Sequence, residues 1–197
     1  MGAYLYDDAL LEKVKGWTVN SQIQVYGTDD TKRLFEVTAD QTNDKPIKLP
    51  IITIDRPKGY TIINATKKPM TFDGVTLKAD EKKALQLNAI PITLKYQIDI
   101  YARYFKEADL YARDLVFNFI NHPKLDVILP YKEADIVHTA NLILDTEVTD
   151  NSGVQQQLSI GQFTRLSLNL TLDEAYLWDC RIRDVISIMD CCKEEDV

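Results

Sequence analysis

The clearest pattern in the chain is an alternation of apolar and polar residues between residues 90 and 101. One set of alternate positions holds Ile90, Ile92, Leu94, Tyr96, Ile98 and Ile100, and the other holds Pro91, Thr93, Lys95, Gln97, Asp99 and Tyr101. Successive side chains of a strand point to opposite faces, so this pattern predicts a strand with one buried and one solvent-facing side. One-sided strands of this kind are typical of antiparallel sheets.

A helix is predicted directly after this strand, from about Lys106 to Asn121, and Pro123 ends it. Stepping by 100° per residue places most of its apolar side chains on one face: Tyr104, Phe105, Ala108, Tyr111, Ala112, Leu115, Val116 and Phe119. Leu110 and Phe117 lie almost opposite, with Ile120 nearby. A second apolar face needs something to cover it, which is either another part of this chain or a neighbouring subunit.

The remaining pattern predicts a helix over residues 3–15, ended at Gly16, and several more strands. The strands fall at residues 23–25, 35–39, 49–54, 60–65, 125–129, 136–148 and 166–172, the last continuing to about Arg183. Asp73-Gly74, within residues 66–88, is a hairpin signal. We therefore expect a single α+β domain over residues 1–197. It has a mainly antiparallel sheet packed by one long helix, an N-terminal helix, a small β-hairpin appendage at 66–88 and a frayed tail at 193–197.

Residues 149–162 form a polar connection between two predicted long strands. Asp150, Asn151, Gln155, Gln156 and Gln157 are its candidate contact residues. Connections of this length are either functional or disordered until a partner arrives. Tyr101 is a further interface candidate, because it falls on the predicted solvent-facing side of its strand and tyrosine is enriched at interfaces.

Composition narrows the possible functions. The 197 residues are 45% hydrophobic and 27% charged, as in globular proteins, and the net charge is −7. An acidic balance argues against gripping DNA phosphates, which requires a basic surface. We expect no membrane segment and no signal peptide, because no apolar run is long enough and the first residues are acidic. The three cysteines, two of them adjacent, indicate a reducing compartment rather than a disulfide framework.

No catalytic or ligand-binding motif is present. His122 and His138 are the only histidines, and Cys180, Cys191 and Cys192 lack metal-ligand spacing. The chain has neither a G-x-S-x-G motif nor a glycine-rich phosphate loop. We therefore expect a protein that is not an enzyme and that uses no cofactor and no metal.

The order of elements over residues 90–175 resembles the tail-terminator, or tail-completion, proteins of tailed bacteriophages. The resemblance rests on the strand Ile90–Tyr101, the acidic and aromatic helix Phe105–Asn121, the strand Pro123–Pro130 and two long strands around a polar loop. The opening segment from Tyr6 to Val14, continuing to Trp17, is also similar to such virion neck proteins.

This resemblance implies a structural subunit of a closed homo-oligomeric ring, commonly a hexamer, at the head-proximal end of the tail. Its partners would be tail tube or sheath proteins and the head–tail connector, and it would assemble in the cytoplasm of the host bacterium. The face with Leu110 and Phe117 would form subunit contacts, and the loop at 149–162 would dock on neighbours. DNA would pass through the acidic lumen without specific binding. The alternatives are another connector, tube or baseplate component, a monomeric binding module, or a small hydrolase built from scattered carboxylates.

Overall fold

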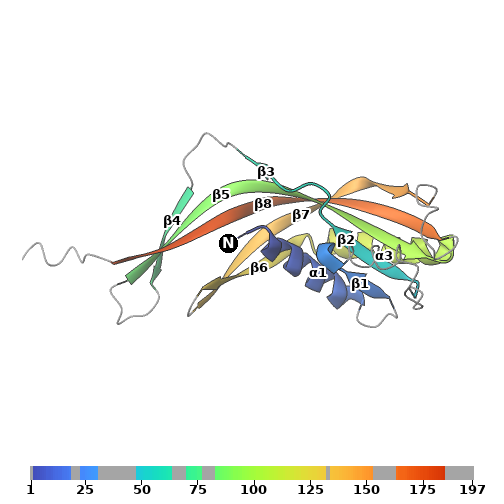
Figure 1. Cartoon of the computed structure of the whole chain (residues 1–197), viewed down its shortest axis with the longest axis horizontal. Helices are drawn as coiled ribbons and strands as arrows, with labels where there is room; N and C mark the ends of the chain where they lie inside the picture. The colour runs from blue at the N-terminus through green and yellow to red at the C-terminus, as the bar shows by residue number, and fades with distance from the viewer. Residues whose placement is uncertain are drawn as a thin grey trace, which may run out of the picture.

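The chain folds into helices packed on a large curled sheet, and a computed structural model describes residues 2–18, 23–30, 48–63, 70–76, 83–131, 134–152 and 163–184. Its elements are α1 (Tyr4–Thr18), β1 (Gln24–Tyr26), β2 (Ile51–Asp55), β3 (Thr61–Ile62), β4 (Met70–Thr76), β5 (Lys83–Ala102), α3 (Phe105–Asn121), β6 (Lys124–Tyr131), β7 (Ala134–Asp150) and β8 (Thr164–Asp184). The predicted α+β class is confirmed (Figure 1). The strand predicted at 35–39 and the tail at 193–197 lie outside the described residues.

The sheet is built around its two longest strands, β5 and β8. The strand order is β1-β2-β5-β8-β7-β6, and β3 and β4 also pair with β5. Every pair is antiparallel except β1 with β2, which is parallel. The expectation of a mainly antiparallel sheet is therefore confirmed, with one parallel pair at the β1 edge.

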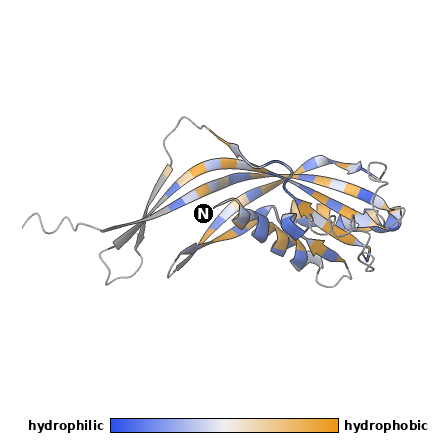
Figure 2. Ribbon diagram, viewed as in Figure 1, coloured by the Kyte–Doolittle hydropathy of each residue, from blue (hydrophilic) through white to orange (hydrophobic). Residues whose placement is uncertain are grey.

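The predicted buried face of β5 is confirmed, and its alternation is visible in Figure 2. The side chains of Ile92, Leu94, Tyr96, Ile98 and Ile100 are buried in the main core. The prediction of a uniformly wet opposite face is wrong, because Asp99 and Tyr101 are also buried. The pattern of one strand reveals its period but not what its neighbours place over the polar side.

Helices α1 and α3 lie on the same face of the sheet (Figure 1). The buried residues of α1 are Tyr6, Leu10 and Val14, and those of α3 are Ala108, Ala112, Leu115 and Phe119. The rings of Trp17 and Phe119 meet edge to face at 4.8 Å and join the two helices. The predicted end of α1 at Gly16 is wrong, since the helix continues to Thr18, whose hydroxyl donates to the carbonyl of Val14.

An arm of three strands extends beyond the helices (Figure 1). It consists of β4, the first part of β5 and the last part of β8, which reaches Asp184 as the strand predicted to about Arg183. β4 and β5 pair from Met70 with Ala89 to Thr76 with Ala84, as a hairpin at 66–88 requires. The prediction that Asp73-Gly74 forms its turn is wrong: these residues lie inside β4, at a register shift. Glycine within a strand commonly marks such a bulge.

β8 separates from β7 at Glu174, which adopts a left-handed conformation with φ 59°. Pairing of β7 with β8 begins at Asn141 and Asp173, so the first part of β7 diverges from β8. Side chains satisfy the backbone groups at the fork. His138 Nε2 lies 2.8 Å from the Glu174 carbonyl oxygen, and the Tyr6 hydroxyl accepts from the Tyr176 amide at 2.8 Å and donates to its carbonyl at 3.2 Å. The Tyr6 hydroxyl therefore bonds backbone groups of β8 that a neighbouring strand bonds elsewhere in the sheet.

Candidate functional site

The side of α3 that faces away from the sheet is strongly apolar and exposed. Phe117 is 61% exposed, Ile120 is 63% exposed and Leu110 is 43% exposed. The second apolar face predicted for this helix is therefore present, and no other part of the described chain buries it. Three large apolar side chains on one exposed stripe are typical of a contact surface rather than of a solvated helix face.

Two basic residues lie on the same stripe. Stepping by 100° per residue, five side chains fall within an arc of about 80°: Lys106, Leu110, Arg113, Phe117 and Ile120. We call these five residues the outer stripe of α3. Shallow hollows lie beside it, one lined by Leu110 and Tyr104 and the other by Phe117 and Trp17. The stripe thus combines apolar and basic side chains, of which Arg113 already pairs with the neighbouring Asp114 at 2.9 Å, and the recesses beside it can accept side chains of a partner.

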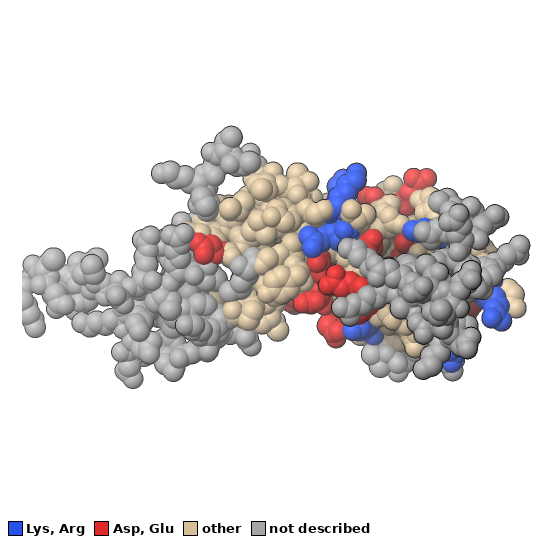
Figure 3. All heavy atoms as spheres, in the orientation of Figure 1, with Lys and Arg blue, Asp and Glu red and all other residues tan. Residues whose placement is uncertain are grey.

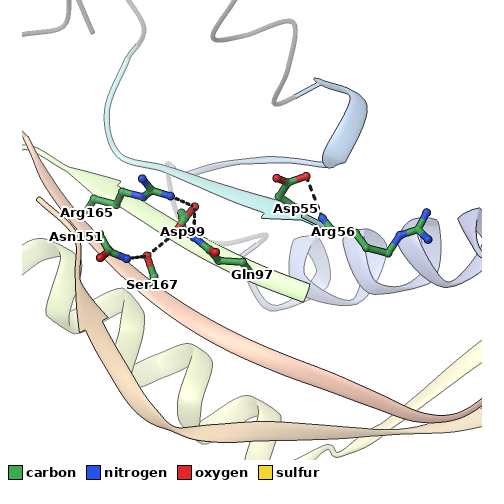
Figure 4. Close-up of polar contacts among 7 residues, drawn as sticks. All are labelled: Asp55, Arg56, Gln97, Asp99, Asn151, Arg165 and Ser167. Carbon is green, nitrogen blue, oxygen red and sulfur yellow. Dashed lines mark hydrogen bonds and ion pairs between the residues drawn. The ribbon is translucent and has the colours of Figure 1, made fainter. Parts of the chain in front are cut away.

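A second unusual region is a buried polar cluster on the opposite face of the sheet (Figure 4). The Asp99 carboxylate lies at its centre and is 4% exposed. Arg165 Nη2 donates to it at 2.8 Å, and Gln97 Nε2 donates at 3.0 and 3.2 Å. The hydroxyl of Ser167 also donates to Asp99. This set of donors satisfies a carboxylate that would otherwise be costly to bury.

The cluster arises from the pairing of β5 with β8. The register sets Asp99 opposite Ser167 and Tyr101 opposite Arg165, so four polar positions meet on one face. Burial alone would lower the pKa of Arg165, but the hydrogen bond and charge of Asp99 hold it above its usual value. Burial, with the charge of Asp99, raises the pKa of Tyr101 to about 12. Both groups therefore keep their ordinary protonation states across the physiological range.

The interface prediction for Tyr101 is not supported, because its side chain is buried within the chain. Its ring lies 5.6 Å from the ring of Phe163, and the Arg165 guanidinium lies over it at 5.6 Å. The wet face assumed for Tyr101 is covered at this end of the strand by residues of β8 and the segment before it. A buried tyrosine of this kind stabilises the fold rather than contacting a partner.

The described ends of the polar loop are attached to this cluster. Asn151 Nδ2 donates to the Ser167 hydroxyl at 2.8 Å, and the Asn151 amide donates to the Arg165 carbonyl at 2.8 Å. The Arg165 amide donates to the Ser152 hydroxyl at 3.0 Å. Asn151 therefore has a structural role. Asp150 is exposed and accepts from the Ser152 hydroxyl and from the Ser152 amide, the latter at 3.0 Å, and these two hydrogen bonds lower its pKa. Gln155, Gln156 and Gln157 lie outside the described residues.

A third polar group joins α1 to the sheet. Asp7 accepts from the Tyr96 hydroxyl at 2.7 Å and from Arg56 Nη2 at 2.9 Å. Burial raises the pKa of the Asp7 carboxyl despite these donors. Asp7 and Asp8 line a hollow with Asp29 and Asp30, and acidic side chains gather near the middle of the face in Figure 3. With Arg56 already bound to Asp7, this group holds the helix in place.

The described part of the chain contains no set of three or more His, Cys, Asp or Glu residues arranged to hold a metal ion. His138 is half-buried and bonded to Glu174, while His122 caps the end of α3 and is exposed. Cys191 and Cys192 lie outside the described residues, as does the side chain of Cys180. Among the described helices, none has the length and apolar character needed to cross a membrane.

The sequence pattern identified the apolar residues of the outer stripe, but neither its two bases nor the Asp99 cluster. Leu110, Phe117 and Ile120 are recognisable because helical spacing is local. Asp99 and Arg165 are 66 residues apart and looked like ordinary polar positions on two separate strands. Only the pairing of the two longest strands could have indicated that Asp99 and Arg165 meet. The sequence alone does not fix the register of that pairing.

Neither a protein-family model nor a curated protein matches the chain.

Proposed function

We propose that this chain is a non-enzymatic structural protein of a tailed bacteriophage, a tail-terminator or neck subunit that forms a homo-oligomeric ring. The ring, a hexamer in this proposal, caps the tail tube and joins it to the head–tail connector. It forms in the cytoplasm of the host bacterium and remains in the virion. The single observation that carries the proposal is the exposed apolar stripe on α3, at Leu110, Phe117 and Ile120.

An exposed stripe of this kind favours assembly over a monomeric role. Phe117 and Ile120 are each more than half exposed, although the opposite face of the same helix is well packed. Burying such side chains gives about 25 cal/mol for each Å² removed from water, which is a direct driving force for association. A ring uses this force at every subunit contact.

Charge and shape agree with the proposed place in the virion. The net charge of −7 suits a ring through which DNA passes, because like charge repels phosphates. The arm of β4, β5 and β8 projects beyond the helices and offers a surface for a tube, sheath or connector neighbour (Figure 1). The order of elements that resembles tail terminators, strand–helix–strand followed by two long strands, is the order of β5, α3, β6, β7 and β8.

The test is the mass of the purified protein, measured by light scattering, together with negative-stain electron microscopy. We expect closed rings of several 22.6 kDa subunits. Phe117→Asp should abolish them, because it places a charge in the contact, and should leave the circular dichroism spectrum unchanged. Tyr60→Asp is the matched control, since Tyr60 is also an exposed aromatic residue but lies away from α3.

Two results would overturn the proposal. One is a wild-type protein that stays at 22.6 kDa at millimolar concentration. The other is a ring that Phe117→Asp leaves intact, because the contact would then lie elsewhere.

A further inference from the structure

The face of the sheet opposite the helices also carries exposed apolar residues. On β7, Val137 and Ile143 are exposed, and on β6 the exposed Ile128 lies directly opposite Val137. These positions alternate with Ala140 and Leu142, which face the helices and are buried. The two-layer subunit therefore has uncovered apolar side chains on both of its outer surfaces, the helix layer and the sheet layer.

The charges of the two surfaces are complementary. Alternate residues of β7 facing away from the helices are Val137, Thr139, Asn141 and Ile143. The exposed Asp145 follows them where the register with β8 shifts, and we call these five residues the outer row of β7. This row contains an acid and no base, and Asp173 of β8 lies opposite Asn141. The one base beside the row on β6 is Lys124, also opposite Asn141. The outer stripe of α3 instead contains two bases, Lys106 and Arg113, and no acid, although Arg113 already pairs with the neighbouring Asp114 at 2.9 Å. Lys106 is therefore the base of the stripe that the charge match rests on.

The order of charged and aliphatic groups near the two ends of the surfaces also matches, while Phe117 falls beside Thr139. The stripe runs from Lys106 through Leu110 to Ile120, a length of about 21 Å at 1.5 Å per residue. The row runs in the reverse direction from Asp145 through Ile143 to Val137, about 26 Å at 3.3 Å per residue. If the two lie antiparallel, Lys106 faces Asp145, Leu110 faces Ile143, and Ile120 faces Val137 beside Ile128. The remaining mismatch in length is within the reach of these side chains.

We propose that the outer stripe of α3 in one copy packs antiparallel against the outer row of β7 in the next copy. The inference rests on the proposed ring and names the surface that covers α3. Because the two surfaces lie on opposite layers of the subunit, each copy uses one surface toward each neighbour. Such a head-to-tail contact closes into a ring when the rotation between copies permits it. Two α3 stripes packed face to face would instead bring like charges together.

Cysteine cross-linking tests both the partner surface and the direction. In a background with Cys180, Cys191 and Cys192 replaced by serine, a Leu110→Cys copy is mixed with an Ile143→Cys copy and oxidised. We expect a covalent dimer from the mixture and none from either variant alone. Ile120→Cys with Val137→Cys should behave in the same way. The matched control is Leu110→Cys with Val137→Cys, which the antiparallel direction keeps apart.

Charge-reversal variants in a chain that keeps its native cysteines give an independent measurement. This measurement decides the question if the serine-substituted background fails to fold. Lys106→Glu should weaken assembly by about threefold, the effect expected of one exposed ion pair. Asp145→Lys should weaken it similarly, and the two changes combined in one chain should restore it.

The possible failures can be told apart. Rings of unchanged mass, with cross-links only between Leu110→Cys copies, would overturn this inference and leave the proposed ring standing. Cross-linking of Leu110→Cys to Val137→Cys in place of Ile143→Cys would overturn the antiparallel direction. A wild-type protein that never assembles would overturn the proposed function, and this inference with it.

Discussion

Apolar side chains are usually buried and charged side chains usually face water. The outer stripe of α3 breaks the first rule, and the Asp99 cluster breaks the second. The stripe leaves Phe117 and Ile120 in water, whereas the cluster removes Asp99 and Arg165 from it. In the cluster, hydrogen bonds from the same chain surround the carboxylate and offset the cost of burying it. On the stripe, no described residue covers the exposed apolar side chains. The cluster therefore contributes to folding, whereas the stripe is the surface that the proposed assembly would use.

The two regions should therefore respond differently to substitution. Changes in the Asp99 cluster should lower the stability of the isolated subunit. Changes on the outer stripe should leave that stability nearly unchanged and alter association.

Asp99→Leu should have the largest effect, a loss of about 3 to 5 kcal/mol in the free energy of unfolding, because it leaves the largely buried Arg165, whose side chain is 13% exposed, without its partner. Urea unfolding followed by tryptophan fluorescence measures the loss. Adding Arg165→Met should recover most of it, since the double variant has no unpaired charge. A loss below about 1 kcal/mol would mean that water reaches the cluster and would remove the contrast between the two regions.

The two faces of α3 provide the next test within one helix. Leu115→Ala should lower stability by about 2 to 5 kcal/mol, because Leu115 is buried against the sheet. Phe117→Ala should change it by no more than about 0.5 kcal/mol in the dissociated subunit. Both values come from denaturation at a concentration below assembly. Equal losses would show that Phe117 belongs to the core of the subunit.

Asn151→Ala tests whether the loop end is attached to the cluster. It removes the hydrogen bond to Ser167 and should lower stability by about 1 kcal/mol. Asn169→Ala is the control, since Asn169 is an exposed amide on the same strand as Ser167, and it should change stability by less than about 0.5 kcal/mol. If the two variants lose the same stability, the attachment contributes nothing.

The smallest effect concerns pH and His138, a polar ring that is only half-buried. Burial lowers its pKa, so the folded protein binds the proton less tightly than the unfolded chain does. Stability should therefore fall as the pH decreases below about 6.5, the ordinary histidine value, toward the lower folded value. His138→Phe should reduce this slope when unfolding is compared at pH 7.5 and 5.5. An unchanged slope would show that the pH dependence of stability arises from other titratable residues.

Local patterns predicted the elements well, whereas contacts between distant segments were not predictable. The alternation from Ile90 to Tyr101 identified the core of β5, and the spacing around Leu110 and Phe117 identified the exposed side of α3. Both depend on the geometry of a single element. The burial of Tyr101 depends on β8, and the bulge at Asp73-Gly74 depends on the pairing of β4 with β5. A single sequence does not specify the register between distant strands, so these features could not be predicted.

The bond between Tyr6 and Tyr176 has a consequence for the order in which the protein is made. The two residues are 170 positions apart, so α1 leaves the ribosome long before the strand that its tyrosine completes. β5 must likewise wait for β8, its most extensive partner. Such distant contacts slow folding and leave strand edges uncovered meanwhile. The outer stripe of α3 is synthesised in that interval, so the nascent chain already carries this exposed apolar surface before its own sheet is complete.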